Sequence, residues 1–150
     1  AVLRQLSTAP VDVLVGDGVL LADADARSLG DNIHRAGTVP AHLLAGHIDA
    51  SITHGGEGTV QTACLAGVPF AGMQAEQRWN IEECARYGNA LRFAKHDVHR
   101  GQMHGILDRL LSDETMRAKA RQLSKAMRGM DGPTRAVEVI EGYLKDCNPA

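Results

Sequence analysis

The segment that most constrains the fold is ASITHGGEGTVQTACLAGVP, residues 50–69. It predicts a short apolar strand over residues 50–53, a turn rich in glycine, and a helix that begins near Thr59 and ends at Gly67. Glycine lets backbone N–H groups approach a ligand without a Cβ in the way, and the first turn of a helix offers unpaired donors and the positive end of its dipole. The segment therefore predicts an anion-binding turn between a strand and a helix.

Strands and helices alternate along the rest of the chain. Strands are predicted at residues 11–15, 32–38, 50–53, 68–73 and 90–93, and helices at 4–9, 42–45, 59–66, 76–87, 98–111, 114–128 and 134–144. This alternation predicts an α/β fold, a parallel sheet with helices on both faces, followed by a helical tail.

Composition excludes several classes of function. The 150 residues, 44% of them hydrophobic, provide for one domain, and the net charge of −2 comes from 16 basic and 18 acidic residues spread along the chain. This charge does not indicate a nucleic-acid surface or a polybasic membrane patch. No apolar run approaches the ~20 residues of a membrane span, and the first ten residues do not resemble a signal peptide, so we expect a cytoplasmic protein.

The candidate metal, redox and dinucleotide motifs are weak. Cys64, Cys84 and Cys147 lack C-x-x-C spacing, and we interpret the first two as small apolar residues on helices. His99 and His104 are five residues apart rather than three or four, so we expect no metal site there. The loop GDG after the first strand has Leu21 in the place of a third glycine, and an NAD site is therefore not indicated.

The sequence after HGGEGT carries a family likeness. Residues 67–81 read GVPFAGMQAEQRWNI. The two segments resemble the donor-sugar-binding half of glycosyltransferases with the GT-B fold, above all bacterial enzymes that use UDP- or dTDP-sugars, whose pattern is H-G-G-x-G-T, then G-V-P, then D-Q-x-x-N-A. The likeness covers roughly residues 31–143. It implies a Rossmann-like doubly wound parallel sheet and a transferase of hexosyl groups that needs no metal and no cofactor besides its nucleotide-sugar donor.

The resemblance assigns the diphosphate to the turn. In such an enzyme, catalysis depends mainly on hydrogen-bond donors placed beside the departing phosphate, where negative charge grows. Here these donors would be the ring of His54, the backbone N–H groups of residues 56–59 and the Thr59 hydroxyl, with Gly55, Gly56 and Gly58 leaving room for the phosphates. The alternative for His54 is a strand-end histidine that is hydrogen-bonded to a neighbouring carbonyl.

The sugar would be bound by Glu76 and Gln77, which stand where the family has its Asp-Gln pair. Carboxylate and amide groups both suit sugar hydroxyls. Glu76 is one methylene longer than the family's Asp, so the identity of the sugar is not determined. The charge of Glu76 could equally favour the first turn of a helix. Asn80 is expected to brace the loop.

The base and ribose are matched less well. Thr38 and Thr62 stand where related plant enzymes have a stacking tryptophan and a ribose-binding glutamate. We expect backbone groups near Val39 to hold the base. The sequence therefore does not decide whether the base is uracil or thymine. Thr62 and Gln61 are candidates for the ribose or ordinary helix residues, and Trp79 is interpreted as packing or interdomain surface.

The resemblance also implies parts outside residues 1–150. In the family a strand in the middle of the sheet precedes the helix with which this sequence opens, and an acceptor domain carries the catalytic base. We therefore expect one nucleotide-sugar-binding domain of a larger two-domain enzyme, inactive alone. Without the middle strand, we expect that strands 11–15 and 50–53 pair directly, that the chain borrows a strand from a neighbour, or that the isolated chain is unstable. A homodimer, a donor-binding subunit of a split two-chain glycosyltransferase and a UDP-sugar 2-epimerase-like domain remain alternatives.

Overall fold

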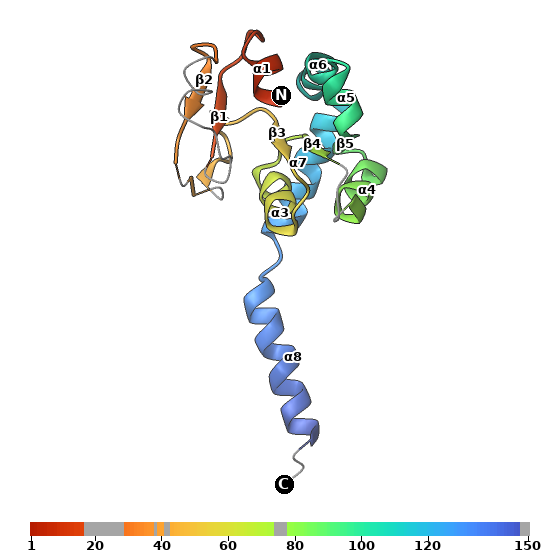
Figure 1. The fold of residues 1–150 in the computed structure, drawn as a ribbon. Coiled ribbons are helices and arrows are strands. Elements are labelled where there is room, and N and C mark those ends of the chain that lie inside the picture. The colour runs from red at the N-terminus through yellow and green to blue at the C-terminus, as the bar shows by residue number, and fades with distance from the viewer. Residues whose placement is uncertain (17–28, 38, 41–42, 74–77, 148–150) are drawn as a thin grey trace.

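The computed structural model describes residues 1–16, 29–37, 39–40, 43–73 and 78–147 (Figure 1). Its strands are β1 (Val13–Val15), β2 (Ile33–Arg35), β3 (Ser51–Thr53), β4 (Phe70–Met73) and β5 (Ala90–Phe93). Its helices are α1 (Val2–Leu6), α3 (Glu57–Ala66), α4 (Arg78–Tyr87), α5 (Lys95–His99), α6 (Met103–Ser112), α7 (Glu114–Arg128) and α8 (Gly132–Cys147). The predicted alternation of strand and helix is thus confirmed.

The described strands form two parallel sheets. The first contains β1 and β2, with Val13 opposite Ile33, and the second has the order β3-β4-β5. Within the described ranges no ladder joins β1 to β3, so the first of the three alternatives, direct pairing of residues 11–15 with 50–53, is not the one found there. Both strands are positioned by packing, because Val13 and Ile52 contact the same apolar cluster. The other two alternatives, a strand borrowed from a neighbour and an unstable chain, stay predictions.

Two apolar clusters cover the two faces of the second sheet. Adjacent residues of β4 separate them, since Ala71 belongs to one cluster and Phe70 to the other, as alternation along a strand requires. The first cluster joins α1, α5, α6 and the start of α7 to the sheet, and the second joins α3 and α4, with Leu123 and Met127 of α7 packed against it. The sheet therefore has helices on both faces, as predicted.

The single helix predicted over residues 98–111 is wrong. The structure has α5 and α6 instead, with a break at Gly101, whose φ of +75° is left-handed. The side chain of Gln5 bonds to both sides of this break: its Nε2 donates to the Val98 carbonyl at 2.6 Å, and its Oε1 accepts from the Met103 N–H at 3.1 Å. A residue distant in sequence thus stabilises a break that the helical periodicity does not reveal.

Other boundaries differ from the predictions by a few residues. β5 and α7 have the predicted bounds, whereas α3 begins two residues early, at Glu57. α1 ends at Leu6 because the chain turns there, with the Ala9 N–H donating to the Leu6 carbonyl. β2 is shorter than the predicted strand 32–38, and the short helix predicted at 42–45 begins outside the described residues.

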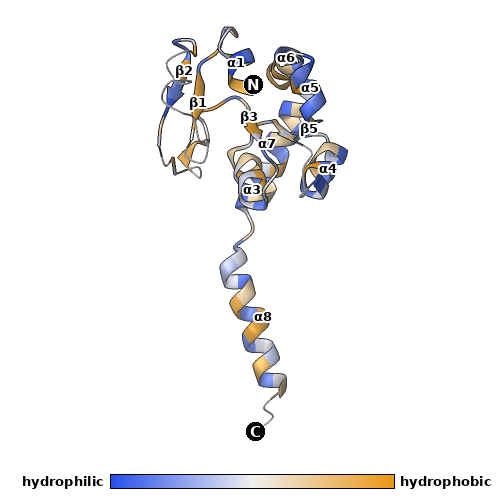
Figure 2. Ribbon diagram, in the orientation of Figure 1, coloured by the Kyte–Doolittle hydropathy of each residue, from blue (hydrophilic) through white to orange (hydrophobic). Residues whose placement is uncertain are grey.

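α8 extends away from the rest of the chain (Figure 1), and its apolar side chains, among them Ile140 and Tyr143, are exposed. Figure 2 shows apolar and polar residues alternating along it. Asp131 caps its first turn by accepting from the Thr134 N–H at 3.1 Å and hydroxyl at 2.7 Å, and these bonds lower the pKa of Asp131. Of the helices in the described ranges, none has the length and apolar character needed to cross a bilayer.

Candidate functional site: the turn between β3 and α3

The turn after β3 presents backbone donors at the start of α3. Gly56 is the N-cap residue, no side-chain hydrogen bond caps the helix, and the helical bonds begin with the Val60 N–H donating to the Gly56 carbonyl at 2.9 Å. The N–H groups of Gly58 and Thr59 precede the first acceptor that the helix provides. Together with the helix dipole, these two donors make the turn suitable for an anion.

His54 lies directly over Gly56. Its side chain is exposed, and a Cβ built on Gly56 would stand 2.6 Å from His54 Nε2. Only glycine at position 56 allows the ring this position. No hydrogen bond joins the His54 ring to another described residue, so the bond to a neighbouring carbonyl considered above is not made within the described ranges.

Two residues of α4, Asn80 and Ile81, contact the turn. The Asn80 side-chain amide donates to the Gly55 carbonyl at 3.4 Å, in agreement with the role expected for Asn80. Ile81 is fully buried, and its Cδ1 would lie 2.5 Å from a Cβ at either Gly55 or Gly72. Gly55 also has a φ of +89°. The turn and the end of β4 thus approach Ile81 so closely that neither glycine has room for a side chain.

The threonine hydroxyls are already engaged in local bonds. Thr53 donates to the Thr59 hydroxyl oxygen at 2.6 Å, and Thr59 in turn donates to the Gly56 carbonyl at 2.8 Å. Thr62 donates to the Gly58 carbonyl at 2.8 Å, one helical turn earlier. The Thr59 hydroxyl proton, expected to face a phosphate, is used in the bond to the Gly56 carbonyl, and the backbone N–H is the donor that Thr59 can offer.

The structure describes some of the remaining predicted residues and not others. Val39 is half-buried, and Gly58 and Thr59 are exposed at the start of α3. Thr38, Glu76 and Gln77 lie outside the described residues. The structure brings together the residues predicted for the diphosphate, and the residues predicted for the sugar are not described. Within the described ranges, no group of three or more His, Cys, Asp or Glu side chains could hold a metal ion.

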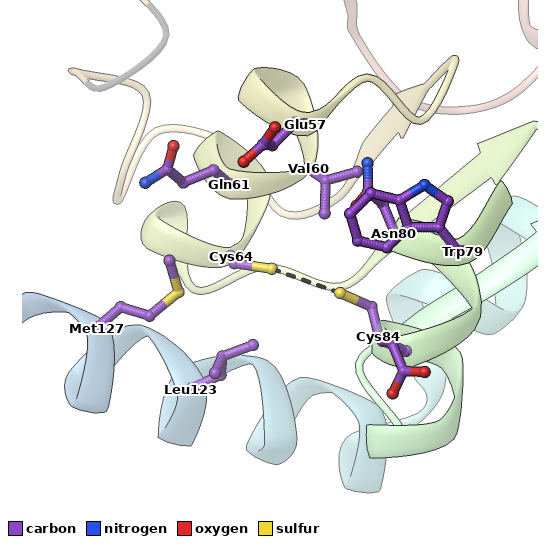
Figure 3. A pocket seen from close by; sticks show the side chains of 10 residues that line it. Glu57, Val60, Gln61, Cys64, Trp79, Asn80, Cys84, Leu123 and Met127 are labelled. Atoms are coloured by element: carbon purple, nitrogen blue, oxygen red, sulfur yellow. Dashed lines mark hydrogen bonds between the residues drawn. The ribbon is translucent and has the colours of Figure 1, made fainter. Parts of the chain in front are cut away.

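A pocket of about 370 Å³ lies beside the turn, between α3, α4 and α7 (Figure 3). Gln61 of α3 and Trp79 of α4, the latter 61% exposed, contribute to its walls, and Cys64 and Cys84 face each other across it with their sulfur atoms 3.9 Å apart. Sequence reasoning missed this pair. A clue was available, because both cysteines fall on helices predicted to flank one strand, residues 68–73.

Comparison with known proteins defines the family. Residues 6–142 match the family described as erythromycin biosynthesis protein CIII-like, C-terminal domain. The chain belongs to this family, and its likeness to the donor-sugar-binding half of GT-B glycosyltransferases is confirmed.

Individual relatives are longer than this chain. The demethyllactenocin mycarosyltransferase of Streptomyces fradiae is 28% identical over 90% of this chain and 30% of its own length. The aklavinone 7-beta-L-rhodosaminyltransferase of Streptomyces galilaeus is 31% identical over 82% of this chain and 29% of its own length. The chain thus spans about a third of the length of each of these two relatives.

Solved structures show the same fold. The calicheamicin glycosyltransferase CalG4 superposes with a TM-score of 0.84 at 24% identity, over 99% of this chain and 40% of that one. The glycosyltransferase VinC, solved in complex with dTDP, superposes with a TM-score of 0.71 at 25% identity, over 82% of this chain and 31% of that one. The expected α/β fold of a GT-B carboxyl-terminal domain is therefore confirmed.

Proposed function

We propose that this domain binds the nucleotide-sugar donor of a glycosyltransferase that transfers a hexosyl group from a dTDP- or UDP-sugar to an acceptor. The observation that carries the proposal is the start of α3, where no side chain caps the helix and the N–H groups of Gly58 and Thr59 follow a glycine turn overlain by His54. The transferase names of the relatives and the dTDP bound to VinC support the same reading.

In this proposal each part of the donor has its own residues. The diphosphate lies on the turn formed by Gly55, Gly56, Gly58 and Thr59, beside His54. The base contacts the backbone near Val39, the ribose contacts Thr62, and the sugar hydroxyls bond to Glu76 and Gln77. The catalytic base comes from an acceptor domain outside these 150 residues. We expect the enzyme to work in the cytoplasm.

His54 acts in this scheme by stabilising the departing phosphate. Negative charge grows on the β-phosphate as its bond to the sugar breaks, and a ring N–H placed beside that oxygen becomes a stronger partner as the charge develops. The helix dipole and the amides of Gly58 and Thr59 act in the same direction without moving, because the turn fixes them before the donor arrives.

Calorimetric titration of the chain tests the binding half of this proposal. We expect dTDP or UDP to bind more tightly than GDP, and His54→Ala to weaken that binding about 10- to 100-fold, as loss of a hydrogen bond to a charged group implies. His99→Ala is a matched control, since His99 is an exposed histidine on α5. No binding of either pyrimidine nucleotide, or equal losses in both variants, would contradict the proposal.

A further inference from the structure

The thiols of Cys64 and Cys84 form a close pair that the proposed donor site does not use. Cys64 is on α3 and is buried, and Cys84 is on α4 and is half-buried. Their sulfur atoms are 3.9 Å apart, within hydrogen-bonding distance, although the residues are 20 positions apart in the sequence. Figure 3 shows the two sulfur atoms pointing toward each other across the pocket.

The surroundings favour a thiolate at Cys64. Its sulfur is hydrogen-bonded to the Cys84 thiol and accepts from the Asn89 side-chain amide at 3.6 Å. The bond with Cys84 is the main reason that the pKa of Cys64 falls to about 7, with a smaller contribution from Asn89 and an opposing one from burial. The same shared proton raises the pKa of Cys84. One thiol is thus prepared to attack, and the other holds the proton.

Small molecules can reach the pair through the pocket. Both cysteines line its wall, together with Val60, Leu123 and Met127, and its volume of about 370 Å³ exceeds that of several water molecules. A disulfide bond requires the two sulfur atoms to approach to about 2.0 Å, which is about 1.9 Å closer than they are here. Because both cysteines line the pocket, the remaining approach would be made at its wall by rotation of their side chains.

We propose that Cys64 and Cys84 are a site of reversible oxidation, at which a low-molecular-weight disulfide of the glutathione type converts the two thiols into one intramolecular disulfide between α3 and α4. The Cys64 thiolate attacks one sulfur of the reagent, forms a mixed disulfide and releases the first small thiolate. That thiolate takes the proton of Cys84, whose sulfur then attacks the Cys64 sulfur and releases the second. Two protein thiols are oxidised by two electrons, and one small disulfide is reduced to two thiols.

The test uses the Cys147→Ser chain, in which Cys64 and Cys84 are the remaining cysteines. The folded chain is incubated with oxidised glutathione, residual thiols are blocked with iodoacetamide, and the intact mass is measured. We expect loss of two hydrogen atoms, about 2 Da, with no bound glutathione and no alkylation, and full reversal by dithiothreitol. Peptide mapping should join the peptides that contain residues 64 and 84.

A second variant separates the pair from single-thiol chemistry. After incubation with oxidised glutathione, the Cys84→Ala/Cys147→Ser chain should carry either one glutathione or one free thiol. This incubation should raise the urea unfolding midpoint of the two-cysteine chain and leave that of the Cys84→Ala/Cys147→Ser chain unchanged. Far-UV circular dichroism checks that both chains are folded. Alkylation of both thiols after treatment, a persistent glutathione adduct on the two-cysteine chain, disulfide-linked dimers as the main product, or a bond that forms only in urea would each overturn the proposal.

Discussion

The turn after β3 needs glycine at adjacent positions for different physical reasons. Gly55 has a positive φ and has Ile81 against the place where a Cβ would be. Gly56 has an ordinary φ of −59°, and the reason for glycine there is the ring of His54 above it. Substitution at Gly55 would therefore disturb the fold, whereas substitution at Gly56 would disturb the site.

The Gly56→Ala variant separates these two effects. The added methyl group should displace the His54 ring and reduce the affinity for dTDP or UDP about tenfold or more, as loss of one bond to a charged group implies. The free energy of unfolding should fall by no more than about 1 kcal/mol, because alanine is a poorer N-cap than glycine. Calorimetric titration and urea unfolding measure the two quantities.

The control for this change is Gly105→Ala, on α6. A Cβ there meets nothing within 4 Å. We expect unchanged nucleotide affinity and a gain in stability of about 0.5–1 kcal/mol, the usual advantage of alanine within a helix. Unchanged affinity in Gly56→Ala as well would show that the His54 ring over Gly56 has no part in binding.

The lowered pKa of Cys64 makes a prediction about pH. Because only the thiolate attacks a disulfide, the initial oxidation rate of the folded Cys147→Ser chain should rise about tenfold per pH unit below pH 7 and level off above it. The same chain in urea should show the ordinary thiol midpoint, about 8.5. Stopped-flow measurement from pH 5 to pH 10 compares the two, and coincident midpoints would contradict the arrangement of Cys64, Cys84 and Asn89.

At the scale of elements, local signals predicted some boundaries and missed others. β5 and α7 have the predicted bounds, and local residues define the ends of α7: Asp113 caps it by accepting from the Met116 N–H at 3.0 Å, and Gly129 follows its last residue. The break between α5 and α6 was missed because its main support, Gln5, comes from the other end of the chain. Periodicity within a segment cannot reveal such a tertiary contact.

Gln5→Ala tests this account of the break. Removal of the amide leaves the Met103 N–H without its partner, and an unsatisfied group costs about 1–3 kcal/mol when it is buried. The Val98 carbonyl loses one of its two donors and keeps the Gly101 N–H at 3.1 Å. Both groups belong to buried residues. We expect a loss of at least about 1 kcal/mol in the free energy of unfolding, measured in urea.

Gln5→Glu is the matched variant. It retains the acceptor for Met103 and loses the donor to Val98, so it should also be destabilised, and it should partly recover at acid pH, where the protonated carboxyl group donates again. If Gln5→Ala were as stable as the unchanged chain, Gly101 alone would explain the break.

The sequence predicted the part of the candidate site that is formed by neighbouring residues, and it missed the part that depends on contacts between helices. The strand, turn and helix that form the first part are adjacent in sequence, so the residues of the turn were found from their order alone. The bracing by Asn80 was expected from the family likeness. The position of Ile81 beneath two glycines and the approach of Cys64 to Cys84 depend on how α4 is rotated against α3, which residue spacing within either helix does not determine.

At the scale of the whole molecule, packing rather than a continuous sheet holds the described parts together. One apolar cluster includes Leu6 of α1, Phe93 of β5 and Met116 of α7, and it also contacts residues of β1 and β3, which share no hydrogen-bonded ladder in the described ranges. α8 stands outside both clusters, with its apolar side chains exposed. The turn before α3 contacts the second cluster through Gly55, whose place for a Cβ is taken by Ile81.

The most direct test of the central claim is a nitrogen-15 NMR titration of the chain with dTDP and with UDP. The account predicts that the largest amide shifts fall on residues 56–59, because their N–H groups would point at the diphosphate, and that inorganic pyrophosphate shifts the same amides in the same direction. The amides of α6, on the other face of the sheet, should stay in place. Saturable binding whose shifts fall elsewhere and leave residues 56–59 unmoved would contradict it.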